Sequence, residues 1–269
     1  MPELAEVEYY RKLWDPGIGA GINAVRLHPA KRIFRGTAPE ILKKTLPGSL
    51  LLSSEAHGKQ MLFRFSNGIW LGLHLGMTGE LRVEKGGFQP GKHDHLVLYQ
   101  QPRALVFSDQ RQFGRVRLHL GTEPPKWWAD LPAPLTSNEF TPAAMLSFLQ
   151  RHRKLPLKAA LLLQSGFPGL GNWMADEILW RARLDPRIPA GQLGDLKAKH
   201  LWRIIRSVCR GAINSVSRGY SALPAGWLFH QRWSRQGNCP RDGRSLLRAT
   251  VGGRTTAWCP KCQPSRAPS

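Results

Sequence analysis

The hydrophobic periodicity changes once along the chain, and this change constrains the fold more than any other feature. Between about residues 23 and 121 apolar and polar side chains alternate, most clearly at 115–120 (RVRLHL). A period of two places the apolar side chains of a strand on one face. The same pattern occurs at 60–66, 69–84, 95–100 and 104–109. Because glycine and asparagine separate several of these segments, we expect an antiparallel β-sandwich.

The second half of the chain has helical periodicity. A linker rich in proline, 122–140, separates it from the strands. Apolar residues then recur at a spacing of three or four in 142–151, 155–164, 172–183 and 195–216. A further helix is expected at 3–14, and a glycine-rich segment with cysteines closes the chain, with disorder expected after Gln263. The pattern predicts an α+β protein with three domains, 1–125, 126–228 and 229–269.

Positive charge dominates the composition. Lys and Arg number 39 against 18 Asp and Glu, which gives a formal net charge of +21 and a sequence pI near 10.8. Such a surface attracts polyanions, although a highly charged soluble enzyme or a membrane-surface protein remains an alternative. Because the basic residues are spread over strands, loops and helices, nucleic acid is the favoured partner.

The cellular location and the cysteine chemistry follow from two further features. No run of about 18 apolar residues is present, and Glu3, Glu6 and Glu8 stand where a signal peptide carries positive charge. We therefore expect a cytoplasmic protein without a membrane partner. Three of the four cysteines crowd near the C-terminus, which favours a metal site over disulfides, whereas Cys209 is expected to be buried in its helix.

The N-terminus offers a possible nucleophile. Removal of Met1 would leave Pro2 with a free secondary amine, which is nucleophilic when neutral and can form an iminium with a sugar aldehyde carbon. Glu3 beside it is a candidate proton donor and acceptor, and Glu6 lies one helical turn further on, where it could orient Glu3. The alternative is an ordinary helix start, because proline followed by acidic residues is common there.

Five motifs in order resemble the formamidopyrimidine-DNA glycosylase and endonuclease VIII family across residues 2–263. The first is the opening Pro-Glu pair, and the second is His57-Gly58-Lys59-Gln60-Met61. The resemblance implies that Pro2 attacks C1′ of a damaged nucleoside and that Lys59 contacts the phosphate of the lesion. It also implies damaged double-stranded DNA as the partner of a monomeric enzyme.

The third and fourth motifs resemble the family's DNA-contacting loops. Leu75-Gly76-Met77-Thr78-Gly79 and Asp109-Gln110-Arg111-Gln112-Phe113-Gly114 resemble two intercalating loops, so Met77, Arg111 and Phe113 are expected to fill the hole left by a flipped nucleotide. The alternative is that these apolar residues belong to small satellite cores. The segment 169–177 resembles a helix-two-turn-helix, in which glycines, helix amides and Asn172 bind phosphate while Asn172 also caps the helix. Leu163 stands where the family usually has aspartate.

The fifth motif resembles the family's zinc β-hairpin. Its ligands would be Cys239, Asp242, Cys259 and Cys262, with aspartate in place of the usual second cysteine. Carboxylate is an accepted but harder zinc ligand, so a structural Cys3Asp zinc site is expected, with a metal-free hairpin packed by Trp233 and Trp258 as the alternative. Arg254 between the pairs matches an arginine that grips the flanking phosphates.

The resemblance implies base excision followed by β-elimination and δ-elimination. Leu4, Glu6 and Val7 match the branch that acts on oxidised purines, but Ala5 replaces its usual proline, and the lesion-capping segment 217–228 is short. A glycosylase for alkylated or crosslinked bases therefore remains an alternative, as does a catalytically silent protein that binds particular DNA structures. One of the ten tryptophans could stack on a base, and the sequence does not indicate which.

Overall fold

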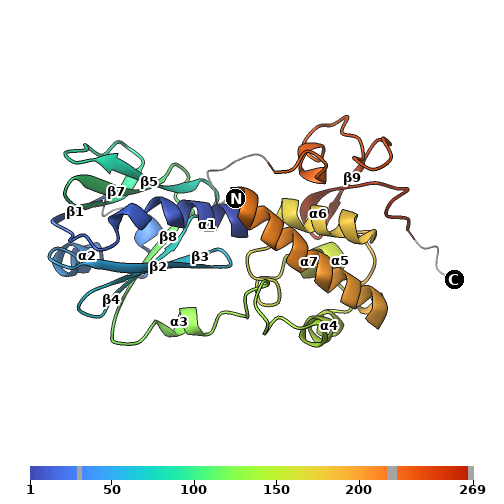
Figure 1. The fold of residues 1–269 in the computed structure, drawn as a ribbon, viewed down its shortest axis with the longest axis horizontal. Helices are drawn as coiled ribbons and strands as arrows, with labels where there is room; N and C mark the ends of the chain where they lie inside the picture. The colour runs from blue at the N-terminus through green and yellow to red at the C-terminus, as the bar shows by residue number, and fades with distance from the viewer. Residues whose placement is uncertain (29–31, 217–222, 266–269) are drawn as a thin grey trace. The chain divides into compact units, whose positions relative to one another are not determined.

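The computed structural model describes residues 1–28, 32–216 and 223–265. The chain forms two compact units, Met1–Leu131 and Pro132–Ser269. The first unit holds the strands of the sandwich, and the second holds most of the helices and a β-hairpin (Figure 1). An α+β fold is therefore confirmed, and each unit is described in turn.

Unit 1 is a sandwich of two antiparallel four-stranded sheets. One sheet has the order β1 (Ala24–Leu27), β6 (Asp94–Tyr99), β7 (Arg103–Asp109), β5 (Gly79–Lys85). The other has the order β2 (Leu51–His57), β3 (Gln60–Phe65), β4 (Ile69–His74), β8 (Arg115–Leu120). Both sheets contribute to one buried core, for example through Phe63 and Phe107. The alternating pattern therefore predicted the sandwich correctly, because one face of each sheet must be apolar.

Helix α1 (Leu4–Leu13) packs against this sandwich, as the helical pattern at 3–14 predicted. Val7 and Trp14 join the core, and the Trp14 ring lies 4.8 Å from the ring of Phe63. The Trp14 indole donates a hydrogen bond of 3.2 Å to the Arg82 carbonyl. The short η1 (Asp15–Gly17) follows. These contacts hold the start of the chain on a rigid core.

Two local predictions were wrong, and the linker holds a short helix that the sequence did not indicate. The segment 69–84 is two strands, β4 and β5, which belong to different sheets and are joined by a turn. The alternating region is interrupted by η2 (Arg32–Phe34) and by α2 (Pro39–Thr45), which has proline in its first turn. The linker contains α3 (Lys126–Ala129), where Trp127 packs so closely on Gly72 that a Cβ there would lie 2.5 Å from the indole.

The helices of unit 2 are those that the sequence predicted, although α5 is shorter than 155–164. They are α4 (Pro142–Arg151), α5 (Leu157–Leu161), α6 (Asn172–Ala182) and α7 (Asp195–Val216), with η3 (Ala190–Gln192) and η4 (Leu228–His230) between elements. Thr141 caps α4, since its hydroxyl accepts from the Ala144 amide at 3.2 Å. Cys209 of α7 is buried, which confirms its assignment as an apolar residue. None of the helices within the described ranges is long and apolar enough to cross a membrane.

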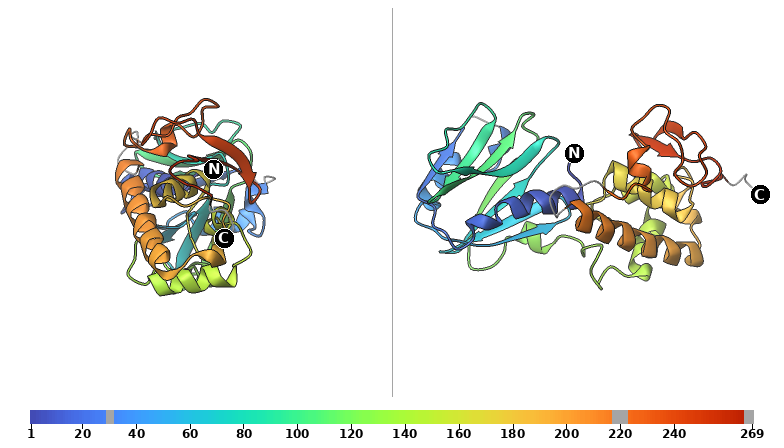
Figure 2. Two further views of the ribbon diagram at one scale, coloured as in Figure 1. Left: turned by 90° about the vertical axis from the view of Figure 1, so that its right-hand side faces the viewer. Right: turned by 45° about the horizontal axis from the view of Figure 1, so that its top comes forward.

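The hairpin of β9 (Leu247–Val251) and β10 (Arg254–Trp258) lies beside α6 (Figure 2). Gly252 and Gly253 have φ angles of 58° and 74°, so the two-residue turn requires glycine. Trp180 of α6, Leu228 and Ala257 share a small buried core with cysteines of the hairpin. Of the two tryptophans named for the alternative of a metal-free hairpin, Trp258 is buried, whereas Trp233 is 60% exposed.

Candidate functional site

The side chains of Glu3 and Glu6 form a reciprocal capping box at the start of α1. The Glu3 carboxylate accepts from the backbone amide of Glu6, and Glu6 Oε2 accepts from the Glu3 amide at 3.1 Å. Glu3 is buried, whereas Pro2 is half-buried and Met1 is exposed. The capping box therefore fixes both the backbone and the carboxyl group of Glu3, the residue that follows the candidate nucleophile in the chain.

The two expected intercalating loops are joined by the buried carboxylate of Asp109. Its Oδ1 accepts from the Thr78 hydroxyl at 2.7 Å and from the Arg111 amide at 3.2 Å, while Oδ2 accepts from the Gly114 amide at 2.7 Å. Gly76, with a φ of 63°, lies so close to the second loop that a Cβ would stand 2.4 Å from the Phe113 carbonyl carbon. The loops therefore form one structure although they lie in different parts of the sequence.

Met77, Arg111 and Phe113 project from these joined loops. Met77 is 41% exposed and Phe113 is 40% exposed, so neither belongs to a satellite core. The Arg111 guanidinium lies over the Phe113 ring, 4.9 Å from its centroid. Arg35 supports the second loop from outside, since Nη1 donates to the Gly114 carbonyl at 2.8 Å. The three predicted residues are thus exposed on two joined loops, the second of which Arg35 holds at Gly114.

Lys59 lies in the turn between β2 and β3, close to a histidine that the sequence analysis did not single out. His74 is the register partner of Gln60 on β4, and the Gly76 amide donates to its Nδ1 at 3.0 Å. Burial, aided by the positive charges of Lys59, Arg117, Arg35 and Arg115, lowers the pKa of His74 to about 4. The imidazole is therefore neutral at physiological pH, and because Nδ1 accepts, its proton resides on Nε2.

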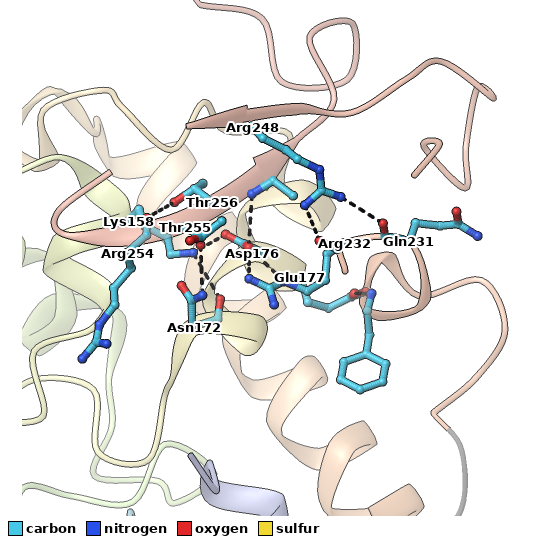
Figure 3. Close-up of polar contacts among 12 residues, drawn as sticks. Lys158, Asn172, Asp176, Glu177, Gln231, Arg232, Arg248, Arg254, Thr255 and Thr256 are labelled. Carbon is cyan, nitrogen blue, oxygen red and sulfur yellow. Dashed lines mark hydrogen bonds and ion pairs between the residues drawn. The ribbon is translucent and has the colours of Figure 1, made fainter. Parts of the chain in front are cut away.

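Asn172 at the start of α6 is joined to the residue that follows Arg254 at the start of β10 (Figure 3). The Asn172 side-chain amide donates to the Thr255 carbonyl at 2.9 Å. The hairpin turn also packs on α5, because a Cβ on Gly252 would lie 2.5 Å from Ala159 Cβ. Arg254 is exposed and forms no ion pair with the described residues. One expectation is corrected, since Gly171 is the N-cap and Asn172 is the first residue of the helix.

A buried ionic network holds this arrangement together (Figure 3). Asp176 of α6 pairs through Oδ1 with Lys158 Nζ and through Oδ2 with Arg232 Nη2 at 2.6 Å. The Ala257 amide of β10 also donates to Oδ2 at 3.3 Å, and Lys158 Nζ donates to the Asn172 carbonyl at 3.1 Å. Because two cations share one carboxylate away from water, loss of that carboxylate would leave two buried positive charges without their negative counterpart.

The expected metal ligands converge. The ligand atoms of Cys239, Asp242, Cys259 and Cys262 all lie within 4.8 Å of one another. Cys239 Sγ lies 3.8 Å from Cys262 Sγ, and Asp242 Oδ2 lies 3.5 Å from Cys259 Sγ. Zinc bond lengths of about 2.3 Å to sulfur and 2.0–2.2 Å to oxygen predict tetrahedral edges of about 3.8 and 3.5 Å. The donors therefore fit a tetrahedral metal ion.

Neighbouring groups also favour a cation at this cluster. Burial and the adjacent Cys239 and Cys259 thiols raise the pKa of Cys262 to about 12, since several negative donors oppose one another without a positive charge. The Trp180 indole donates to Cys239 Sγ at 3.3 Å, and the Arg244 amide donates to Asp242 Oδ1 at 3.1 Å. These hydrogen bonds fix one thiol and the carboxylate in their orientations.

Comparison with known proteins agrees with this geometry. The model of the formamidopyrimidine-DNA glycosylase N-terminal domain matches residues 1–116, and that of the H2TH domain of the same glycosylase matches residues 131–222. A formamidopyrimidine-DNA glycosylase of Geobacter metallireducens is 34% identical over 98% of this chain and 100% of its own. That of Thermus thermophilus is 36% identical over 98% of both chains.

Solved structures agree as well. A Lactococcus lactis formamidopyrimidine-DNA glycosylase bound non-covalently to DNA with an AP site has a TM-score of 0.86, at 27% identity over 98% of this chain and 100% of that one. A mutant of the Lactococcus enzyme bound to Fapy-dG DNA has a TM-score of 0.85 at 30% identity, with the same coverage. The fold and site thus define a DNA glycosylase and AP lyase of base-excision repair. The chain belongs to the formamidopyrimidine-DNA glycosylase family.

Sequence reasoning missed His74, Asp109 and Asp176 as organising residues. A histidine in an alternating strand and an aspartate at a strand end have no distinctive local signal, although Asp109 opens a motif that the analysis quoted. Residues 217–222 of the expected capping segment 217–228 lie outside the described ranges. Their contribution to the site stays a prediction.

Proposed function

We propose that Pro2, freed from Met1, is the nucleophile of a bifunctional glycosylase. The observation that supports this proposal is the capping box of Glu3 and Glu6, which fixes a buried carboxyl group on the residue next to Pro2 in the chain. The neutral amine forms a bond to C1′ as the glycosidic bond breaks, and the base leaves with a proton. Glu3 donates a proton to O4′ as the sugar ring opens, which gives the iminium.

Strand cleavage follows from the same intermediate. The iminium acidifies the C2′ proton, and its removal expels the 3′ phosphate in β-elimination. A second elimination expels the 5′ phosphate. Release of Pro2 by water then restores the enzyme, so no redox cofactor is required for the sequence of steps.

The DNA backbone is bound by both units in this proposal. Lys59 of unit 1 and Asn172 and Arg254 of unit 2 contact phosphates near the lesion, and Met77, Arg111 and Phe113 fill the space of the flipped nucleotide. His74 joins them, because its neutral ring beside Lys59 presents Nε2–H as a donor to a phosphate oxygen. A neutral donor adds a hydrogen bond without adding repulsion among the neighbouring cations.

A structural zinc ion is proposed for Cys239, Asp242, Cys259 and Cys262. The tetrahedral spacing and three sulfur donors support it, since thiolates select zinc over magnesium or calcium. When bound, zinc would neutralise the crowded donors and rigidify the turns on either side of the hairpin. The hairpin carries Arg254, so the ion would act on DNA binding through the position of this arginine.

The proposed substrate is an oxidised purine in double-stranded DNA. Support comes from Leu4, Glu6 and Val7 in the opening motif and from relatives that are named formamidopyrimidine-DNA glycosylases. The proposal includes a cytoplasmic monomer with a catalytic domain at 1–125, a helix-two-turn-helix domain at 126–228 and a hairpin domain at 229–269. An alkylated or crosslinked base is the second candidate, favoured by Ala5 and the short capping segment.

Borohydride trapping tests the nucleophile. The processed protein should become covalently attached to DNA with an abasic site, because borohydride reduces the iminium. A form that retains a blocked N-terminus should give no adduct, whereas Pro2→Gly keeps a primary amine and should give some. Intact-mass measurement verifies which N-terminus each sample has. Equal trapping by the blocked form would rule out Pro2, and no trapping by any form would favour a silent DNA-binding protein.

The roles of Glu3 and of the metal have separate tests. Glu3→Gln should retain DNA affinity and lose base excision across a panel of oxidised and alkylated lesions, and the same panel identifies the substrate of the wild type.

Elemental analysis should find about one zinc per chain, and Cys259→Ser should lose both zinc and lesion binding. Full activity without metal would mean that packing alone holds the hairpin.

A further inference from the structure

Trp233 stands apart from the other tryptophans. Of the ten in the chain it is the one with an exposed side chain, at 60%, whereas the others are buried or half-buried. It lies between η4 and the first cysteine of the metal cluster. Exposing the large apolar surface of an indole to water costs free energy, so an exposed indole indicates a contact surface for a partner.

The indole is held in place from one side. The Arg232 guanidinium lies over the ring, 4.1 Å from its centroid, and is itself fixed by two hydrogen bonds to Asp176 Oδ2. Arg248 of β9 secures the surrounding backbone by donating to the carbonyls of Gln231, Arg232 and Ser234. The guanidinium and the Phe229 ring contact the indole, and 60% of the residue still remains exposed. The ring is therefore held in place while much of its surface is open to a partner.

The surroundings of this ring identify the chemistry of its partner. Residues 223–265 contain six arginines and one lysine but a single acidic residue, Asp242. The ring of Phe229 lies 5.9 Å from that of Trp233 and 5.1 Å from that of Trp173, which follows Asn172 in α6. A flat apolar face in a basic region close to a phosphate-binding helix end fits an aromatic group carried on a polyanion.

We propose that the exposed ring of Trp233 is a stacking site for an unpaired nucleobase of the bound DNA. Base flipping creates two such bases, the extruded base and its orphaned partner on the other strand, and the chemistry of stacking is the same for both. This inference rests on the proposed function, which supplies the flipped nucleotide. Stacking on a rigid aromatic ring requires no hydrogen-bond pattern, so the site accepts any base.

The test is a binding cycle with duplexes of identical sequence, all in the Glu3→Gln background to prevent cleavage. One duplex carries a tetrahydrofuran abasic analogue opposite thymine, the second has the analogue on both strands, the third carries an oxidised guanine, and the fourth is undamaged. Trp233→Ala should weaken binding roughly tenfold where the stacked base is present, since stacking contributes on the order of that factor. Trp233→Phe should retain most of the affinity.

The pattern of loss distinguishes the source of the base. A loss on the first duplex that disappears on the second assigns the orphaned base, and a loss confined to oxidised guanine assigns the extruded base. Leu196→Ala, which removes an 85% exposed apolar side chain of α7, is the matched control and should change nothing. Equal loss on all four duplexes, a changed salt dependence, or no loss would overturn the proposal. If the Glu3→Gln protein with Trp233 intact shows no preference for damaged duplexes, the proposed function fails instead.

Discussion

Units 1 and 2 hold their exposed side chains by different means. In unit 1 the capping box joins residues three apart, and Asp109 accepts from amides two and five residues further along the chain and from the Thr78 hydroxyl 31 residues earlier. In unit 2 Asp176 binds partners that are 18, 56 and 81 residues away. Most of these contacts in unit 1 join neighbouring residues and survive small movements of the fold, whereas the network of unit 2 exists only when α5, α6 and the hairpin are all in place. The comparison predicts that unit 2 is the more sensitive to loss of one buried group.

The largest effect is expected from Asp176→Ala. It leaves Lys158 and Arg232 buried without their carboxylate, which costs about 3–5 kcal/mol of unfolding free energy. Urea unfolding followed by hydrogen exchange should place the loss in unit 2. Asp195→Ala removes an exposed acid of α7 and serves as control. A loss no larger than that of the control would show that the network contributes little and remove the contrast between the units.

His74 gives the next effect, and it depends on pH. Its pKa is lowered to about 4 in the folded state, so between pH 4 and 6.5 the folded state binds fewer protons than the unfolded state. The contribution of His74 to the unfolding free energy is therefore complete above about pH 6.5 and is lost as the pH falls towards 4. The shift corresponds to about 3 kcal/mol. His74→Gln should flatten the unfolding free energy of unit 1 between these pH values. His200→Gln, at an exposed histidine of α7, should keep the wild-type slope.

Asp109→Asn should lower the unfolding free energy by about 1.5–3 kcal/mol. The side-chain NH2 of the asparagine would face a backbone N–H, of Arg111 or Gly114, that donates to the carboxylate in the wild type. Thr78→Val removes one of the hydrogen bonds and should cost less. Hydrogen exchange at the two loops measures the local loss of stability. Binding to abasic DNA measures its effect on the residues expected to intercalate, Met77, Arg111 and Phe113. Unit 2 should keep its protection, and a global loss of protection would contradict the local nature of this device.

The smallest effect is expected in the salt dependence of DNA binding, when one proposed phosphate contact is removed from each unit. Arg254→Ala and Lys59→Ala should each reduce the slope of log affinity against log salt by about 0.9, and the double variant by about twice as much. Binding is measured by titration of one abasic duplex over a series of salt concentrations. Both variants should weaken binding to all sequences alike. An unchanged slope for either residue would place it away from the DNA.

The sandwich, the helices and the metal cluster were predictable because their signals lie in neighbouring residues. Alternation at 115–120, the Thr141-Pro142 helix start and the spacing of the cysteine pairs are properties of short segments. The prediction failed where two consecutive elements have the same hydrophobic pattern. Residues 69–84 alternate throughout, so only packing shows that a turn sends β5 into the other sheet.

The tertiary structure alone decided which charged groups became buried partners. Asp176, Asp109 and His74 are ordinary residues in the sequence, and their roles arise because distant segments meet around them. The cost of an unpaired charge depends on burial, and burial depends on every segment packed nearby. The sequence by itself therefore determined the periodic elements and the donor types, while the folded chain decided which donors meet and which tryptophan, Trp233, stays exposed.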